Sequence, residues 1–418
     1  MGKSEKSLAK NTFFLYVMQI SGYVFPILTF PYLTRILGPA NYGVVVFSNA
    51  AMSYFQMLLE FGFILSATSE ISLHRDDIQK VQKITFSVIW AKVFLSVAGA
   101  FILFFCIAFV EKFKEYSLFF ILSYIGIFLT IFLPDFLFRG IERMSILTYR
   151  VIAAKFVYTL CIFLFIHKAS DFIFVPVAVI VSNLVAVILA WLEILKKLKL
   201  KFVFVDLKDI FAELKKSSVF FLSRIAVSMY QTLNTILLGF RFSSESLAMY
   251  GVSNNLISCG RSLLSPISDS IYPYMVKNKN YRLVKKLILI LEPLIIAGCV
   301  LLYFITPWFI RVFCGAGYEN DAVPVFRAML PLIVISLPTY LFGYPLMGAL
   351  GILNVANISV IAGSVFHVAG LAILFMFGKL SFIPVAFLTF GTEIVVFSIR
   401  LFFGIKKLVI KNLGAKNE

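Results

Sequence analysis

The sequence has little charge: Asp, Glu, Lys and Arg make up 14% of the 418 residues, whereas 61% are hydrophobic. That leaves too little polar surface to cover a water-soluble globule of this size. The apolar runs reach about 20 to 28 residues, long enough for membrane-crossing helices, and they lack the alternating pattern of a membrane β-barrel strand. The sequence therefore predicts an all-α integral membrane protein.

Residues that commonly carry catalysis are also scarce. The three histidines, His74, His167 and His367, are scattered, and the five cysteines have no metal-binding or disulfide spacing. The chain has no GxxxxGK[ST] nucleotide loop, no HExxH and no CxxC motif. We expect free thiols, no metal, no cofactor and no enzymatic activity. His367, alone in an apolar run, is expected to be a packing residue.

Positive charge is in excess, with 38 Lys and Arg against 21 Asp and Glu. In a soluble protein this would suggest a nucleic-acid partner, but here most basic residues lie in short loops on one side. That placement follows the positive-inside rule, so we expect no nucleic acid, both termini in the cytoplasm and a location in the cytoplasmic membrane. No cleavable signal peptide is expected, because the first apolar run is too long and lacks a small-residue cleavage site.

Twelve apolar runs are predicted to form transmembrane helices: 11–37, 43–70, 82–110, 116–138, 146–167, 172–195, 217–241, 247–275, 284–310, 324–349, 353–377 and 381–404. Tyr42-Gly43-Val44 recurs as Tyr250-Gly251-Val252, in the same run of each half. Each half has six runs, and an even number of membrane crossings returns the chain to the side on which it started. The two halves therefore have the same orientation and form a parallel repeat. We expect an N-terminal lobe at 1–195, a cytoplasmic connector at 196–216 and a C-terminal lobe at 217–418 with a basic tail. Apolar residues at 207, 210, 211 and 214 predict an interfacial helix in the connector.

Polar residues form stripes at helical spacing inside three runs. They are Asn49, Ser53, Gln56 and Glu60; Asn254, Ser258, Arg261, Ser265 and Asp269; and Arg224, Ser228, Gln231 and Thr235. A charge at mid-bilayer costs at least about 2.5 to 3.5 kcal/mol, so it faces a cavity or a partner. The predicted substrate-binding residues are Arg224, Arg261, Arg35, Lys92, Lys155, Asn49, Gln56, Asn254 and Gln231. The predicted ion-coupling residues are Glu60, Asp269 and Glu393.

Each of these residues also has a structural interpretation. Arg261 is the deepest, and it lines the cavity or forms an internal ion pair, for which Glu60 is the candidate partner. Arg224, Lys92 and Lys155 lie close enough to the cytoplasmic ends of their runs to snorkel, and Arg35 can anchor the chain at the interface. The three carboxylates can bind a proton or cation, or they can pair with a nearby base.

Several short motifs resemble one family along the whole chain. They are residues 31–38 (PYLTRILG) followed by Tyr42-Gly43, residues 138–144 (FRGIERM), residues 271–275 (IYPYM) and residues 391–393 (GTE). Together they are similar to Wzx-type O-antigen flippases, of the polysaccharide branch of the multidrug/oligosaccharidyl-lipid/polysaccharide exporters. Two features depart from the pattern: Arg139 stands where the family more often has Gln, and the connection at 348–354 lacks a basic residue.

The resemblance implies a V-shaped pair of six-helix lobes, working as a monomer, that moves an undecaprenyl-diphosphate-linked oligosaccharide across the bilayer. It also implies polymerase and chain-length proteins as partners, and membrane potential with an H⁺ or Na⁺ gradient as the driving force. Three alternatives remain. A multidrug cation exporter conflicts with an arginine-lined cavity, a lipid II flippase usually has two further helices, and a membrane polysaccharide polymerase would need a large external loop.

Overall fold

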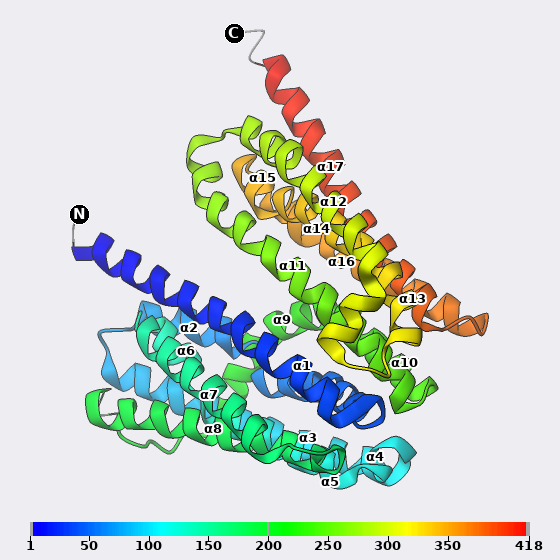
Figure 1. Cartoon of the computed structure of the whole chain (residues 1–418). Helices are drawn as coiled ribbons and strands as arrows, with labels where there is room; N and C mark the ends of the chain where they lie inside the picture. Colours follow the sequence, from blue (N-terminus) through cyan, green and yellow to red (C-terminus); the bar gives the residue numbers. More distant parts are fainter. Residues whose placement is uncertain (1–2, 199, 415–418) are drawn as a thin grey trace. The chain divides into compact units, whose positions relative to one another are not determined.

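The structure, a computed structural model, describes residues 3–198 and 200–414. Every regular element in these ranges is a helix, which confirms the predicted all-α class. The chain divides into two compact units, unit 1 (Met1–Ile225) and unit 2 (Ala226–Glu418). Figure 1 labels the helices of both units along the chain.

Unit 1 begins with α1 (Lys3–Glu60), which contains the first predicted run and most of the second. Gly38, with φ 67° and ψ 173°, leaves helical geometry at the point where the two helices of α1 meet. Glycine adopts this positive φ without steric cost, and the proline that follows it suits the first turn of a new helix. The Gly38-Pro39 pair therefore ends the first helix and starts the second.

The run predicted at 43–70 is not a single helix, because it is interrupted at Phe61 and Gly62, which both have positive φ. A Cβ atom added to Gly62 would lie 2.7 Å from Phe220 Cβ and 2.9 Å from the Ser217 carbonyl oxygen. A larger residue would thus collide with α9 (Leu207–Gln231). The short helix α2 (Phe63–Leu73) starts after this break.

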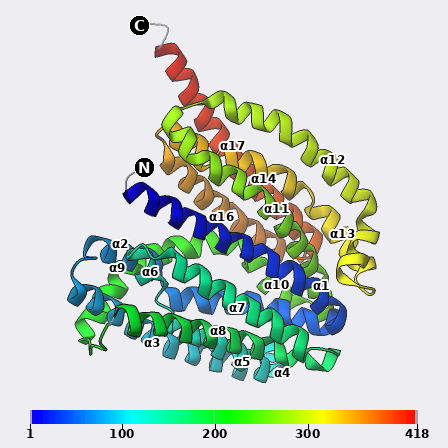
Figure 2. The same cartoon turned by 60° about the vertical axis from the view of Figure 1, so that its left-hand side comes forward.

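The rest of unit 1 is a bundle of helices: α3 (Ile78–Phe109), α4 (Glu111–Glu115), α5 (Ser117–Leu129), α6 (Asp135–Gly140), α7 (Met144–Phe165) and α8 (Phe174–Glu193). Helices α7 and α8 lie side by side in both views of the bundle (Figures 1 and 2). Phe63, Val88 and Leu137 are completely buried in its core. Apolar burial of this kind places the polar residues of α1, α3, α6 and α7 at defined positions beside the core.

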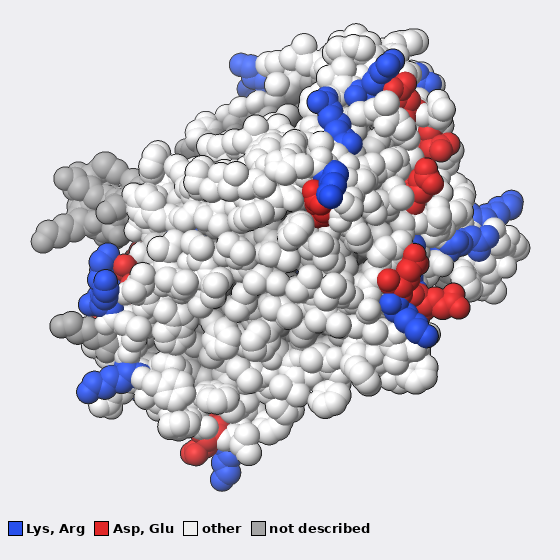
Figure 3. All heavy atoms as spheres, turned by 60° about the horizontal axis from the view of Figure 1, so that its bottom comes forward, with Lys and Arg blue, Asp and Glu red and all other residues white. Residues whose placement is uncertain are grey.

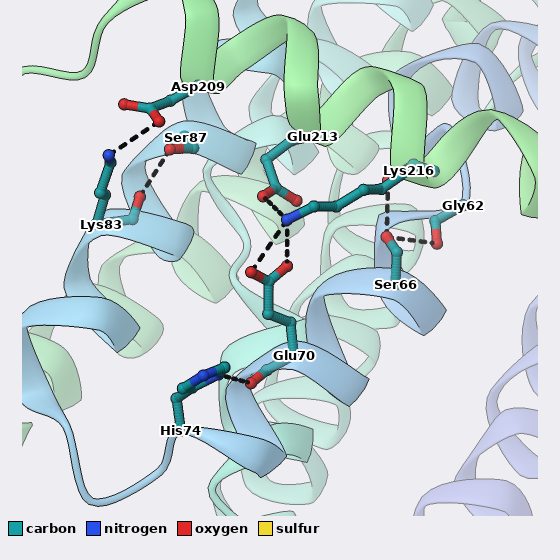
Figure 4. Close-up of polar contacts among 10 residues, drawn as sticks. Gly62, Ser66, Glu70, His74, Lys83, Ser87, Asp209, Glu213 and Lys216 are labelled. Atoms are coloured by element: carbon teal, nitrogen blue, oxygen red, sulfur yellow. Dashed lines mark hydrogen bonds and ion pairs between the residues drawn. The ribbon is translucent and has the colours of Figure 1, made fainter.

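The helix predicted in the connector is confirmed: α9 begins at Leu207 and continues without a break to Gln231. Figure 4 shows how its first turns lie against α2 and α3. Lys216 Nζ binds both carboxylate oxygens of Glu70 at 3.0 and 3.1 Å and Glu213 Oε1 at 3.1 Å, and Lys83 Nζ lies 2.8 Å from Asp209 Oδ1. Because Ile210 is also buried, this part of α9 belongs to unit 1.

Unit 2 consists of α10 (Leu233–Arg241), α11 (Ser244–Asn278), α12 (Tyr281–Cys314), α13 (Glu319–Met329), α14 (Pro331–Leu341), α15 (Tyr344–Ala349), α16 (Leu353–Met376) and α17 (Phe382–Gly414). The run predicted at 324–349 is divided among α13, α14 and α15. Met275, Leu337 and Met347 are completely buried where α11, α14 and α15 pack together.

Nine helical segments in the described residues are long and apolar enough to cross a membrane. One of them, Phe13–Leu73, contains the first two predicted runs. The runs at 217–241 and 247–275 form helices α9, α10 and α11 but fall outside these nine segments, so the count of twelve stays a prediction. Figure 3 shows a broad uncharged surface, with Lys, Arg, Asp and Glu mostly at its margins. Such a surface suits contact with lipid.

Candidate functional site

Unit 1 contains a cavity of about 410 Å³ between α1, α3, α6, α7 and α8. Its charged lining residues are Glu60, Lys92, Asp135, Arg150 and Lys155. Gln56, Tyr158, Ser182 and Asn183 add neutral polar groups to the wall. The cavity thus gathers four residues predicted from the sequence: Lys92, Lys155, Gln56 and Glu60.

Both carboxylates of the cavity are already paired with arginine. Arg150, only 4% exposed, lies with Nη1 2.5 Å from Asp135 Oδ1 and donates from Nη2 to Asp135 Oδ2 at 2.8 Å. Arg224 Nη1, on α9, lies 2.6 Å from Glu60 Oε2. Arg224 itself is half-exposed. These pairs neutralise the two acidic groups of the cavity.

The two lysines of the cavity form no ion pair among the described residues. Lys92 is 7% exposed, and its ammonium lies over the Phe136 ring, 5.6 Å from the ring centroid. Lys155, partly buried on α7, reaches across to Gly22 of α1. An ammonium is attracted to an aromatic face, but that contact is not an ion pair. The two ammonium groups can therefore contact an anion that enters the cavity.

Unit 2 contains a second cavity, of about 340 Å³, with a different lining. Its walls include Asn254, Ser258 and Arg261 of α11. Tyr340 of α14 and Thr389 of α17 also line it. Arg261 Nη2 donates to Glu393 Oε1 at 2.5 Å, and its Nε donates to Ser336 Oγ at 2.8 Å. The candidate pairing of Arg261 with Glu60 is therefore wrong. Glu60 is bound by Arg224, and Arg261 is bound by the predicted ion-coupling residue Glu393.

The remaining predicted residues lie apart from these two cavities. Arg35, Asn49 and Asp269 are exposed on their helices. The side chain of Gln231 lies outside the described residues. His367 is completely buried as expected, and its ring nitrogens lie 2.8 Å from Thr392 Oγ1 and Asn234 Oδ1.

Sequence reasoning missed the pair of Arg150 and Asp135. Arg150 is close to Arg139 and Arg143 in the sequence, so it resembles a residue of a basic cytoplasmic loop. Asp135, next to Pro134 inside an apolar run, was a signal that an intramembrane partner was needed.

Comparison with known proteins identifies the family. The family described as "Polysaccharide biosynthesis protein" matches residues 8–279, more than half of the chain. The chain belongs to this family. A family relative from Escherichia coli strain K12, named "Putative O-antigen transporter", is 30% identical over 83% of this chain and 85% of its own length. A relative of the same name from Shigella dysenteriae is 27% identical over 80% of this chain and 85% of its own length.

Solved structures show the fold of this family member. The lipid II flippase MurJ in an inward closed conformation matches with a TM-score of 0.72, covering 96% of this chain and 89% of that one at 14% identity. An inward-facing multidrug resistance MATE family transporter of the MOP superfamily matches with a TM-score of 0.69, covering 93% and 95% at 14% identity. The predicted family and MATE-like fold are thus confirmed, and the chain is a multi-pass membrane protein.

Proposed function

We propose that this chain is a flippase that moves an undecaprenyl-diphosphate-linked oligosaccharide repeat unit from the cytoplasmic to the outer leaflet by alternating access. The observation that carries the proposal is the pair of lysines, Lys92 and Lys155, which line the unit 1 cavity and form no salt bridge with any residue that the structure describes. A diphosphate is a dianion, and two ammonium groups in a partly dehydrated cavity complement it. The family and the O-antigen transporter relatives supply the class of cargo.

A multidrug cation exporter is disfavoured by the same two lysines, because an organic cation entering this cavity would be repelled by two ammonium groups. The similarity to a lipid II flippase supports the fold only. We therefore retain the oligosaccharide flippase as the function, with the inner membrane as its location and both termini in the cytoplasm.

The membrane potential favours this direction of transport. Moving a dianion outward across an inside-negative membrane releases roughly 4 to 5 kcal/mol per 100 mV. Inward H⁺ or Na⁺ would then reset the empty carrier. Glu60 and Glu393 are suited to that step, because binding of a proton at either carboxylate weakens its pairing with Arg224 or Arg261.

The test is transport in proteoliposomes carrying a fluorescent undecaprenyl-diphosphate oligosaccharide, whose leaflet is read out with an external glycosidase. Lys92→Met and Lys155→Met keep the length of the side chain and remove its charge. Each is expected to slow transport about tenfold or more, since a lost charge-assisted hydrogen bond costs about 1.5 to 3 kcal/mol. Lys92→Arg is expected to retain most of the activity.

Lys112→Met is the matched control. Lys112 is also half-buried and also lies over a phenylalanine ring, 5.1 Å from the centroid of Phe47, but it is not part of either cavity. It should transport at the wild-type rate. Wild-type transport by the Lys92→Met/Lys155→Met double variant would refute the proposal.

A further inference from the structure

The unit 2 cavity differs in chemistry from the unit 1 cavity. Among the eleven described residues that line it, seven carry a hydroxyl or amide group: Asn234, Tyr250, Asn254, Ser258, Ser262, Tyr340 and Thr389. Arg261 is the one charged residue among these eleven. A wall of neutral donors and acceptors forms hydrogen bonds with sugar hydroxyl and acetamido groups.

The charge of Arg261 is balanced within unit 2. Glu393, 4% exposed on α17, accepts its hydrogen bond at 2.5 Å, and Ser336 accepts a second at 2.8 Å. A guanidinium held in this way no longer offers a full positive charge to a phosphate. Arg261 is therefore less suited to bind a diphosphate, the role predicted from the sequence, than to hold the polar side chains around it in place.

The back of the cavity is held by a chain of hydrogen bonds. Asn234, 2% exposed, donates from Nδ2 to Thr389 Oγ1 at 3.1 Å, and its Oδ1 lies 2.8 Å from His367 Nε2. Thr389 donates in turn to the Val385 carbonyl oxygen at 2.8 Å. These bonds fix the side chains of Asn234 and Thr389 before any ligand enters, which lowers the entropic cost of binding.

We propose that the unit 2 cavity is a subsite for an uncharged sugar of the cargo. The inference rests on the proposed function and concerns unit 2 alone: its amides and hydroxyls receive the sugar. A volume of about 340 Å³ is at the lower end for small-molecule pockets and accommodates one or two sugar rings.

The experiment measures binding to the full-length protein in nanodiscs. Three ligands are compared: undecaprenyl diphosphate carrying an N-acetylhexosamine disaccharide, undecaprenyl diphosphate alone, and the soluble disaccharide. The test variant is Asn254→Ala/Ser258→Ala, because both residues line the cavity from α11, Asn254 is partly exposed, Ser258 is exposed, and neither belongs to the buried network. We expect it to weaken binding of both sugar-bearing ligands about tenfold and to leave undecaprenyl diphosphate unchanged.

The matched control is Asn278→Ala/Ser270→Ala, which removes the same two residue types from exposed positions on α11 outside the cavity. It should bind all three ligands as the wild type does. An equal loss for all three ligands in the test variant, or no loss for any, would overturn the subsite.

The two proposals fail separately. If the wild-type protein transports no lipid-linked oligosaccharide but binds the soluble disaccharide through Asn254 and Ser258, the flippase is refuted and the subsite stands. If transport depends on Lys92 and Lys155 while the test variant binds sugar normally, the subsite is refuted and the flippase stands.

Discussion

At the level of single residues, the unit 1 cavity shows how a membrane bundle accommodates charge. Arg150 is almost completely buried, and Asp135 is its ion-pair partner. Burial of a charge is tolerated where a partner compensates it, and removal of one partner leaves the other charge unpaired. Loss of either partner of this pair should therefore destabilise the folded protein, because the remaining charge would be buried without a counter-ion.

We predict that Asp135→Asn lowers the stability of the protein by about 3 kcal/mol, because it leaves Arg150 buried without its counter-ion. Glu142→Gln is the control, since Arg75 and Glu142 form an exposed pair at 2.8 Å whose loss should cost less than about 1 kcal/mol. Denaturation in detergent micelles compares the two variants. Equal destabilisation by both would contradict the prediction, and Asp135→Asn/Arg150→Met should recover part of the loss.

The sequence identified some residues of this cavity and missed others for a physical reason. Lys92 and Lys155 stand out as lysines inside long apolar runs. Arg150 does not, because it lies at the charged start of its run and resembles a loop residue. The partner of Arg261 lies 132 positions away, at Glu393, and no helical spacing reports a contact over that separation.

At the level of helices, α9 is attached to unit 1 through the buried carboxylate of Glu213. Burial raises the pKa of this carboxyl, Glu70 beside it adds to the rise, and the ammonium of Lys216 opposes it. Because the folded-state pKa lies above the unfolded value, the folded state binds the extra proton. Its stabilising contribution is complete below the ordinary value of 4.5 and is lost as the pH rises through the raised value.

We predict that the attachment of α9 weakens as the pH rises above the ordinary carboxyl value of 4.5, and that Glu213→Gln removes this dependence. Hydrogen exchange of the backbone amides at 207–216, corrected for the intrinsic rate, measures the effect. Asp209→Asn, which breaks the more exposed pair with Lys83, should raise exchange at every pH and keep a pH dependence, because burial and Glu70 raise the Glu213 pKa more than Asp209 does. A slope that persists in Glu213→Gln would show that another group titrates.

Helix boundaries were predictable only where the local sequence determines them. The Gly38-Pro39 pair separates the first two helices as the sequence indicated. The break at Phe61 and Gly62 was missed, because its cause is the approach of the α9 backbone from about 155 positions further along. The connector helix was visible in the spacing of Leu207, Ile210, Phe211 and Leu214, but its ion pairs with α2 and α3 were not.

At the level of the whole molecule, composition and motifs were enough to predict a helical membrane protein of the correct family. Hydropathy in long runs determines this class, because only helices satisfy their own backbone hydrogen bonds in lipid. Polar α9 and α11 illustrate the limit. The polar residues of α9 and α11 lower the mean hydropathy of these helices below that of a typical membrane span. The same polar residues include Arg224, which forms an ion pair, and Arg261, which lines a cavity.

We predict that an inside-negative potential accelerates outward transport of the lipid-linked oligosaccharide, because the cargo is a dianion. Proteoliposomes with a potassium diffusion potential set by valinomycin measure the rate. Glu60→Gln/Asp269→Asn/Glu393→Gln should lose the response to an H⁺ or Na⁺ gradient and keep the response to the potential. A triple variant that still responds to the ion gradient would exclude these carboxylates from coupling.

The two cavities lie in separate compact units, and this arrangement has an evolutionary consequence. If unit 2 accepts the sugar as we propose, substitutions among the amides and hydroxyls of α11 would alter the accepted sugar and leave the lysines of α3 and α7 unchanged. The carbohydrate of the cargo could then diverge among relatives while the proposed diphosphate ligands are inherited.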